Sequence, residues 1–265
     1  MSDSSAHASA DDLLIEINDG IALITFNRPQ SRNALTFDMY ERLAATCGRT
    51  DELAIKAIVI TGAGDKAFAA GTDIAQFRAF RTADDALAYE ARISAVLNAI
   101  EQCPVPTVAA INGACTGGGA GIAAACDIRL TSTTLRFGVP IARTLGNCMS
   151  SDTLSRLVSL VGAAATRELL LTARLVEADE AKSMGLVSEI LPDRDAVLAR
   201  AMELATTMAG HAPLTMRAVK EALRRTRQAQ ACEYPDLIEM CYTSEDFREG
   251  LTAFLEKRKP QWQGR

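Results

Sequence analysis

The sequence predicts an α/β protein in which a layered core is followed by a helical C-terminal segment. Apolar runs typical of buried strands alternate with segments of helical spacing through the first two thirds of the 265 residues. From about Ala196 onward the spacing is helical almost throughout, and no internal repeat or low-complexity linker interrupts the chain. We therefore expect a flexible leader at residues 1–10, a core at 11–195 and a helical subdomain at 196–265.

The first element expected is a β-hairpin. Two apolar runs with strand character, 13–17 and 21–26, flank Asn18-Asp19-Gly20, which is typical of a tight turn. A strand that is covered on both faces of a sheet is a continuous apolar run, and such runs often end at glycine. Three further strands are expected on this ground: residues 57–60, 108–111 and 128–130.

Helices are expected between and after these strands, because apolar residues recur at helical spacing. The expected helices of the core are residues 33–46, 84–102, 120–126, 151–161 and 163–173. In the tail a turn is expected at 234–236, and the helices around it carry large apolar side chains that need a partner surface, in this chain or on another subunit. These side chains are Leu237, Ile238, Met240, Phe247, Leu251, Phe254 and Leu255.

Composition and charge exclude several classes of protein. A net charge of −5 and few aromatic residues are unlike a nucleic-acid surface, which needs a basic stripe, so no nucleic-acid partner is expected. The longest apolar stretch, 105–111, is too short to span a bilayer, and the first ten residues lack the basic and apolar regions of a signal peptide. Seven cysteines without metal-ligand spacing predict reduced, mostly buried thiols in a cytoplasmic protein without a metal.

Gly117-Gly118-Gly119 lies between an apolar strand and an alanine-rich helix. Backbone N–H groups at a helix start are unpaired and lie at the positive end of the helix dipole, so they stabilise an anion such as a phosphate or an enolate. Close packing of the helix on the strand would explain the glycines equally well. A nucleotide site is disfavoured, because neither this cluster nor Gly62-Ala63-Gly64 continues into a phosphate-loop or dinucleotide motif.

This cluster, a second turn at Ala69-Ala70-Gly71-Thr72-Asp73 and the segments around them together resemble the crotonase (enoyl-CoA hydratase/isomerase) superfamily. The matching motifs, in family order, are residues 24–29, 33–35, 58–62, 66–74, 110–113, 117–119, 126–128, 137–140, 178–187, 249–250 and 257–260. The resemblance implies stacked ββα turns that form a right-handed superhelix. It also implies an enzyme of fatty acid metabolism that acts on an acyl-CoA and needs no cofactor beyond the coenzyme A of its substrate.

The resemblance further implies where the substrate binds. The backbone N–H groups of Thr72 and Gly118 would form an oxyanion hole for the thioester oxygen, and losing one such donor raises the barrier by about 2.7–4 kcal/mol. The residues placed along the bound CoA are Ser31, Arg32, Ala70, Asp73 and Ile74. Asp73 is better explained as the N-cap of the helix that follows it than as a catalytic group.

The family's C-terminal helices mediate trimerisation, and its trimers commonly pair into hexamers. The resemblance therefore implies a homotrimer or hexamer for this chain, with residues 196–265 as the oligomerisation subdomain. Phe254 and Lys257 would then lie near the CoA of a neighbouring subunit.

The sequence departs from the family at the two positions where hydratases carry glutamates. Hydration of a conjugated double bond needs a base for the water and an acid for the α-carbon. The first position is Gly121, and the second is Ile141, or Ala142 if the alignment is anchored on Gly146. Neither choice supplies an acid or a base.

Replacement groups are sought in the segment that follows. Asp152 could supply a carboxylate, or it could belong to the cap of the helix that begins there. Arg143 could pair with a substrate carboxylate, or it could be a surface arginine. Asn147 and Thr144 could position a water or a polar acyl group, whereas Cys148 is better explained as an inert thiol.

Two functions from different classes follow from these residues. The first is an acyl-CoA enzyme that stabilises a thioester enolate, either as a hydratase or isomerase or as a decarboxylase, hydrolase or C–C lyase whose leaving group generates the enolate. The second is a catalytically silent acyl-CoA binder. The hole favours the first, and the missing glutamates leave the reaction open.

Overall fold

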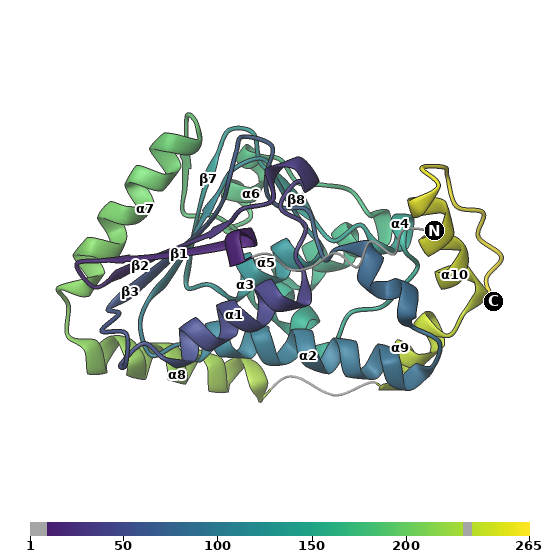
Figure 1. Ribbon diagram of the computed structural model, residues 1–265, viewed down its shortest axis with the longest axis horizontal. Helices are drawn as coiled ribbons and strands as arrows, with labels where there is room; N and C mark the ends of the chain where they lie inside the picture. Colours follow the sequence, from purple (N-terminus) through teal and green to yellow (C-terminus); the bar gives the residue numbers. More distant parts are fainter. Residues whose placement is uncertain (1–9, 230–234) are drawn as a thin grey trace.

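The computed structural model of the protein describes residues 10–229 and 235–265 (Figure 1). Of the expected leader, only Ala10 lies within the described residues, where it begins a short 3-10 helix, Ala10–Asp12. The turn expected at 234–236 begins outside the described residues, and helix α9 starts at Pro235.

The core contains a six-stranded sheet with the order β1-β2-β3-β5-β7-β9. Its strands are β1 (Leu13–Asn18), β2 (Ile21–Phe26), β3 (Ala57–Gly62), β5 (Thr107–Ile111), β7 (Ile128–Ser132) and β9 (Glu189–Leu191). Only β1 and β2 pair antiparallel; the other neighbours are parallel. The hairpin is confirmed, and Asp19 and Gly20 both have positive φ, 52° and 79°, as a two-residue turn that follows the strand twist requires.

A second, three-stranded parallel sheet has the order β4-β6-β8. Its strands are β4 (Ala67–Ala69), β6 (Ala114–Thr116) and β8 (Arg136–Gly138). Sequence periodicity did not predict these strands, because three residues are too few to show alternation. Each follows a strand of the large sheet and precedes a helix, so the chain repeats a strand–strand–helix unit three times. This is the ββα arrangement that the family resemblance implied.

The helices of the structure largely match those expected. They are α1 (Phe37–Gly48), α2 (Ala83–Glu101), α3 (Gly118–Ala125), α4 (Ile141–Thr144), α5 (Ser151–Thr172), α6 (Ala178–Ser183), α7 (Arg194–Ala209), α8 (Pro213–Gln228), α9 (Pro235–Tyr242) and α10 (Glu245–Leu255). The helix expected at 33–46 starts later, since Thr36 caps it and Asn33, at φ 55°, donates its amide to Ala63 and Ala67 carbonyls instead. The two helices expected at 151–173 are the two halves of α5, which is kinked at Gly162.

Helices cover both faces of the large sheet. One face packs on α1, α2, α3 and α5 through the main apolar core, and the other is covered by α7, which contacts β3, β5 and β7 (Figure 1). The expected boundary at residue 196 therefore falls inside a helix that lies on the sheet. Helices α9 and α10 lie at the opposite end of the molecule from α7 (Figure 1).

The two last helices pack on the chain's own core. Helix α9 contacts α2, and α10 contacts α4 and the 3-10 helix η3 (Ile74–Ala79). Phe247 and Ile238 are buried in a small apolar cluster with Phe77 and Leu145. Part of the tail's apolar surface thus has an intrachain partner. Within the described residues, no helix is both long and apolar enough to cross a bilayer.

Candidate active site

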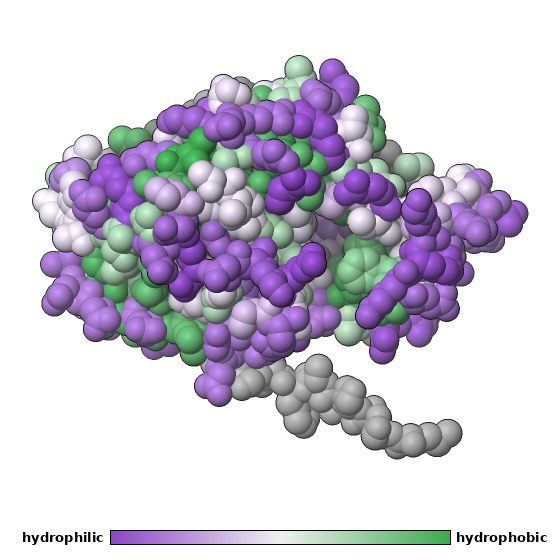
Figure 2. All heavy atoms as spheres, turned by 90° about the horizontal axis from the view of Figure 1, so that it is seen from above, coloured by the Kyte–Doolittle hydropathy of each residue, from purple (hydrophilic) through white to green (hydrophobic). Residues whose placement is uncertain are grey.

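A cavity of about 610 Å³ lies where η3, α2, α4, the start of α3 and the end of α10 meet. Its walls are mostly apolar, and the polar groups on them are few. Figure 2 shows a hollow with hydrophobic residues inside and hydrophilic residues around its rim, at the end of the molecule that holds α4 and α10. A mostly apolar pocket with a few converging polar groups is typical of a small-molecule site.

Two backbone N–H groups, those of Thr72 and Gly118, belong to residues that line this cavity. In the part of the chain that the structure describes, neither N–H donates a hydrogen bond to a protein group. Leu35 fixes the first turn, because its N–H donates to Gly71 O and its carbonyl accepts from Asp73 N, each at 2.9 Å. The Gly117 N–H donates to Gly138 O at 3.0 Å and fixes the second turn.

The two turns approach each other closely because glycine forms both. Gly71 has φ 111° and Gly117 has φ 54° with ψ −120°, conformations that residues with a Cβ rarely adopt. A Cβ atom on Gly117 would lie 3.4 Å from Gly71 Cα, and one on Gly118 would lie 1.9 Å from the Tyr40 hydroxyl oxygen. Side chains at these positions would therefore separate the two free N–H groups.

Two tyrosines hold the Thr72 side chain beneath the turn. Its hydroxyl lies 3.0 Å from the Tyr40 hydroxyl and 2.9 Å from the Tyr89 hydroxyl. Burial raises the pKa of both tyrosines above the ordinary value, so both stay neutral hydrogen-bonding groups. Because helices α1 and α2 supply them, these helices position one half of the expected oxyanion hole.

All five residues expected along the CoA line the cavity: Ser31, Arg32, Ala70, Asp73 and Ile74. The Asp73 carboxylate accepts from Ala75 N at 3.1 Å and forms an ion pair with Arg28 at 3.0 Å. Asp73 is the N-cap of η3, as expected. Its contacts are those of a structural group and leave no catalytic role for it.

The C-terminal end of α10 closes one side of the same cavity. Phe254 and Leu255 line it, so Phe254 lies at the cavity of its own subunit, and its expected place near the CoA of a neighbour stays a prediction. Lys257, at φ 56° just beyond the helix, does not line the cavity.

The positions where hydratases of the family carry glutamates are apolar in this structure too. Gly121 and Ile141 both line the cavity, whereas Ala142 is exposed and does not. Leu97 of α2 occupies the space beside Gly121: a Cβ added there would lie 3.3 Å from Leu97 Cδ1. Neither position delivers a carboxylate, as the sequence predicted.

The structure places two of the replacement groups considered from the sequence outside the cavity. Arg143 is exposed and does not line the cavity. Asp152 lies outside it as well, where its carboxylate forms ion pairs with Arg156 at 2.9 Å and Arg227 at 2.7 Å. The cap of α5 is Ser150, whose hydroxyl accepts from Thr153 N, and Asp152 follows in the first turn.

Sequence reasoning missed a carboxylate that does line the cavity, Glu90 of α2. Its side chain is buried, and its two oxygens accept hydrogen bonds from the Tyr242 hydroxyl at 2.6 Å and from Ser150 N at 2.9 Å. A signal was present, because Glu90, Ile93 and Leu97 recur at the spacing of the apolar face of α2. A glutamate on that face is unusual and needs an explanation.

Three polar residues at the end of α4 and just beyond it also line the cavity: Thr144, Asn147 and Cys148. Asn147 Nδ2 donates to the Tyr242 hydroxyl at 3.0 Å, while its Oδ1 is buried and unpaired within the described structure. The Cys148 thiol is hydrogen-bonded to the Cys241 thiol, and this contact together with burial raises the pKa of Cys148. It is therefore an inert thiol at neutral pH, as expected.

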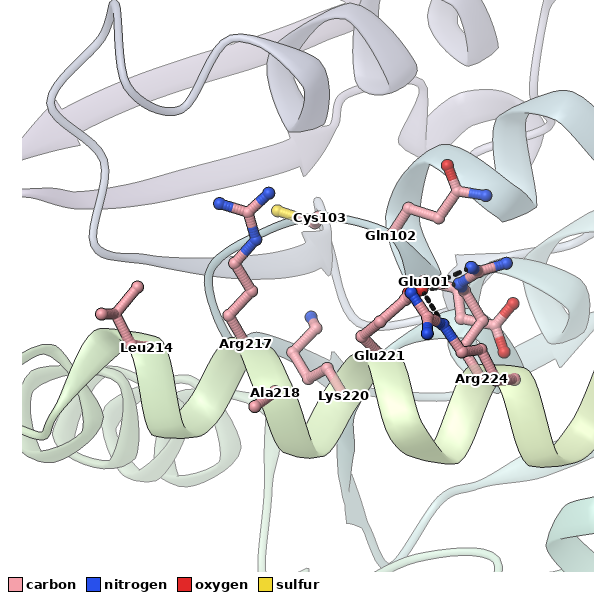
Figure 3. Close-up of a pocket in the computed structure, with 10 residues that line it drawn as sticks. Glu101, Gln102, Cys103, Leu214, Arg217, Ala218, Lys220, Glu221 and Arg224 are labelled. Atoms are coloured by element: carbon pink, nitrogen blue, oxygen red, sulfur yellow. Dashed lines mark hydrogen bonds and ion pairs between the residues drawn. The ribbon is translucent and has the colours of Figure 1, made fainter.

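A second cavity of similar size, about 600 Å³, lies between α8 and the end of α2 (Figure 3). Figure 3 shows Arg217 and Lys220 projecting from α8 toward Cys103. Its carboxylates are already paired: Glu221 binds Arg224 at 2.7 Å and Arg225 at 2.6 Å. Because its carboxylates are occupied by these ion pairs, this cavity does not compete with the first as the candidate site.

Comparisons with known proteins agree with this geometry. The sequence profile of the family "Enoyl-CoA hydratase/isomerase" matches residues 16–265. A short-chain-enoyl-CoA hydratase from Clostridium acetobutylicum is 33% identical over 93% of this chain and 95% of its own length. A crotonyl-CoA hydratase from Syntrophomonas wolfei is 34% identical over 94% of this chain and 96% of its own.

Solved structures share the fold over nearly the whole chain. An enoyl-CoA hydratase/carnithine racemase from Magnetospirillum magneticum is 36% identical with a TM-score of 0.77, covering 97% of both chains. A methylmalonyl-CoA decarboxylase in complex with 2-nitronate-propionyl-CoA is 25% identical with a TM-score of 0.86, covering 96% of this chain and 98% of its own. The expected crotonase fold is thereby confirmed, and the chain belongs to the enoyl-CoA hydratase/isomerase family of acyl-CoA enzymes.

Proposed function

We propose that the protein forms and uses the enolate of an acyl-CoA thioester, with Thr72 N–H and Gly118 N–H as the donors to the enolate oxygen. The observation that carries this proposal is the pair of unpartnered N–H groups on facing turns at one cavity. Fixed donors in a site shielded from water stabilise developing charge without reorganising. The substrate's coenzyme A supplies the thioester, so no further cofactor is invoked.

The lining of the cavity supports an aliphatic acyl group. Ile93, Leu97, Val139, Ile141 and Met149 surround the space beyond the two amides. Arg32 is the one lysine or arginine among the described lining residues, and it lies with Ser31 on the side expected for the phosphates of CoA. A polar or anionic acyl tail would find few partners among these side chains.

Hydration by two glutamates is not supported, because Gly121 and Ile141 provide neither acid nor base. One alternative reaction is decarboxylation, in which departure of carbon dioxide generates the enolate. The higher TM-score to the decarboxylase structure, 0.86 against 0.77, favours keeping it as the second candidate. It needs a malonyl-type substrate, whose carboxylate would enter the apolar part of the cavity.

Exchange of the α-protons of a saturated acyl-CoA in deuterated water tests whether the site removes a proton from the α-carbon and forms the enolate. We expect butyryl-CoA to gain deuterium at the α-carbon only with the protein present, as measured by mass spectrometry. In parallel, crotonyl-CoA hydration should be weak or absent. Binding of butyryl-CoA with neither exchange nor loss of carbon dioxide from methylmalonyl-CoA would refute the proposed function and identify a silent binder. Rapid loss of carbon dioxide from methylmalonyl-CoA would instead select the second candidate.

We further propose that the chain assembles as a homotrimer or hexamer. On α8, Leu214, Val219 and Leu223 expose apolar side chains that find no cover within the described chain. Exposed apolar residues at helical spacing are typical of a surface that a partner covers. Light scattering coupled to gel filtration will give the number of subunits, and a monomeric mass at micromolar concentration would refute this proposal.

A further inference from the structure

We propose that Glu90 is the catalytic acid–base residue of this site and carries a proton between carbon atoms of the bound acyl group. This inference rests on the enolate chemistry proposed above and assigns the group that the missing glutamates leave open. Glu90 lines the acyl cavity from α2, the helix that also carries Tyr89 on the Thr72 side of the site.

The surroundings of Glu90 differ from those of the protein's structural carboxylates. Glu101, on the same helix, pairs with Arg156 at 2.8 Å and Arg227 at 2.6 Å. In the described part of the chain, Glu90 forms no ion pair with a lysine or an arginine. The residue is also only 6% exposed, so bulk water does not replace the missing cation. A buried carboxylate without a cation is costly, so its retention on an apolar helix face indicates a function.

Two hydrogen bonds orient the Glu90 carboxyl group without saturating it. Tyr242 of α9 donates to Oε1, and the Ser150 N–H at the start of α5 donates to Oε2. A carboxylate offers about four acceptor positions, so lone pairs remain for a C–H proton of a ligand in the cavity. The same network ends in Asn147, which donates to Tyr242 and leaves its own Oδ1 buried and unpaired beside the cavity. A buried acceptor without a partner at this place is suited to accept a hydrogen bond from a donor group of a bound substrate.

The pKa of the Glu90 carboxyl group suits proton transfer near neutral pH. Burial raises its pKa to about 7, against the lowering effect of the bonds from Tyr242 and Ser150. A carboxyl group with such a pKa accepts and returns protons with similar ease at physiological pH. The neighbouring groups Tyr40, Tyr89, Tyr242 and Cys148 all have raised pKa values.

Cys241 is the exception among the nearby titratable groups. Its hydrogen bond with Cys148 lowers the pKa of Cys241 to about 7. Any pH profile of the site must therefore separate this thiol from Glu90.

A route for the proton to solvent exists behind Glu90. Besides the acyl cavity, Glu90 lines a third cavity, of about 410 Å³, between α2, α5 and α9. The polar residues of that cavity include Ser94, Asn98, Ser150 and Asp152. Its size and polarity suit water, so Glu90 can exchange its proton with solvent while an acyl group fills the front of the site.

One carboxyl group suffices to move a double bond but not to hydrate one. In the isomerisation, Glu90 takes a proton from C2 of a 3-enoyl-CoA. The electrons of that C–H bond move into a dienolate whose oxygen the Thr72 and Gly118 N–H groups hold. Glu90 then returns the proton to C4, and the double bond lies between C2 and C3. No water or redox partner is consumed, and the apolar cavity suits such a substrate.

The central experiment compares Glu90→Gln with Asp84→Asn in the full-length protein. Both substitutions remove a carboxylate from α2, but Asp84 is exposed in the first turn and away from the cavity. We expect Glu90→Gln to slow isomerisation of 3-hexenoyl-CoA and α-exchange of butyryl-CoA by roughly 10²–10⁴-fold. Butyryl-CoA binding by calorimetry should change little, and Asp84→Asn should match the wild type.

The outcomes separate this inference from the proposed function. Wild-type exchange that persists unchanged in Glu90→Gln overturns the role of Glu90 alone. Loss of carbon dioxide from methylmalonyl-CoA without exchange of butyryl-CoA also overturns the role of Glu90, whereas absence of both reactions in the wild type refutes the enolate proposal itself. If Glu90→Gln does not fold, the pH profile of wild-type exchange and the Tyr242→Phe variant decide the matter.

The pH profile gives a readout that a purely structural role would not move. Wild-type exchange should rise with pH through a limb near 7 as Glu90 ionises. In Tyr242→Phe the limb should move to higher pH, because a donor that favours the carboxylate is lost. Cys241→Ser should leave the limb in place. A limb that disappears in Cys241→Ser, or stays fixed in Tyr242→Phe, overturns the assignment.

Discussion

The side chain of Leu97 lies against the backbone of Gly121 on the wall of the acyl cavity. A Cβ atom at position 121 would approach Leu97 Cδ1 to 3.3 Å and Cδ2 to 3.7 Å. Where hydratases of the family carry their first glutamate, this chain has glycine, and Leu97 fills part of the space that the glutamate side chain would occupy. The site is packed around the change, so it is not a hydratase site from which one side chain has simply been removed.

Gly121→Glu alone should not produce a hydratase. The Cβ of the new side chain lies 3.3 Å from Leu97 Cδ1, so Leu97 must shift by a few tenths of an ångström, and overpacking of this kind costs about 1–3 kcal/mol. The second acid–base position would still be Ile141. We expect no gain in crotonyl-CoA hydration in this variant and a lowered melting temperature.

The matched design adds Leu97→Ala and Ile141→Glu to Gly121→Glu. Leu97→Ala alone should cost about 2–5 kcal/mol of stability, because it leaves a cavity in the core. Hydration should appear only when both glutamates and the smaller residue are combined. Measurable hydration by Gly121→Glu alone would show that Leu97 moves aside without cost to the site, and it would contradict this prediction.

Gly118→Ala should slow α-exchange strongly even though alanine keeps its backbone N–H. Its Cβ would lie 1.9 Å from the Tyr40 hydroxyl oxygen and 3.2 Å from Thr72 Oγ1, so the helix start or Tyr40 must move. Displacement of one donor raises the activation free energy by about 2.7–4 kcal/mol, which lowers the exchange rate by roughly 10²–10³-fold.

Gly48→Ala is the matched control for this substitution, because a Cβ there meets nothing within 4 Å. It should exchange at the wild-type rate. The double variant Gly118→Ala/Tyr40→Phe removes the closest clashing atom and should recover part of the activity. An active Gly118→Ala single variant would argue against Gly118 as a donor.

The fold could be predicted from the sequence where a pattern repeats over enough residues. The hairpin, the buried strands β3, β5 and β7 and the long helix α2 follow from apolar runs and helical spacing. The strands β4, β6 and β8 did not, since three residues carry no period. The start of α1 was misplaced because Asn33 forms side-chain bonds to two carbonyls across the structure, which helical spacing does not reveal.

The backbone of the candidate site could be predicted further than its chemistry. The turns at Thr72 and Gly118 are local in sequence, and glycines mark them. Glu90 lies between them in the chain and meets Tyr242 from 152 residues away. Such a partner comes from tertiary packing alone. The sequence could not place Asp152 either, because its ion-pair partner Arg227 is distant in the chain. This ion pair lies outside the cavity.

Asp152→Asn should lower stability and leave catalysis intact. The carboxylate pairs with Arg156, whose side chain is 1% exposed, and with Arg227. The substitution leaves Arg156 and Arg227 to share the single carboxylate of Glu101, and loss of one member of a buried ion pair costs up to about 3–5 kcal/mol. Chemical denaturation will measure the loss, and α-exchange per folded molecule should equal that of the wild type. A large fall in exchange with unchanged stability would restore Asp152 as a catalytic candidate.

The stability of the protein should depend on pH through Glu90. Its pKa is about 7 in the folded protein against 4.5 for the unperturbed group. Between these values the folded chain holds a proton that the unfolded chain has released, so stability falls as pH rises through this window. The shift corresponds to about 3 kcal/mol at neutral pH and above.

Glu90→Gln cannot ionise and should lose this contribution to the pH dependence. Its melting temperature, relative to the wild type, should therefore increase from pH 4.5 toward pH 7 and level off above it. Differential scanning fluorimetry over this range measures the difference. Asp84→Asn, which removes an exposed carboxylate from the same helix, should give a nearly constant difference. Parallel melting curves for Glu90→Gln and the wild type would mean that Glu90 ionises at an ordinary pKa, and the buried carboxyl group would then be a poor proton carrier at neutral pH.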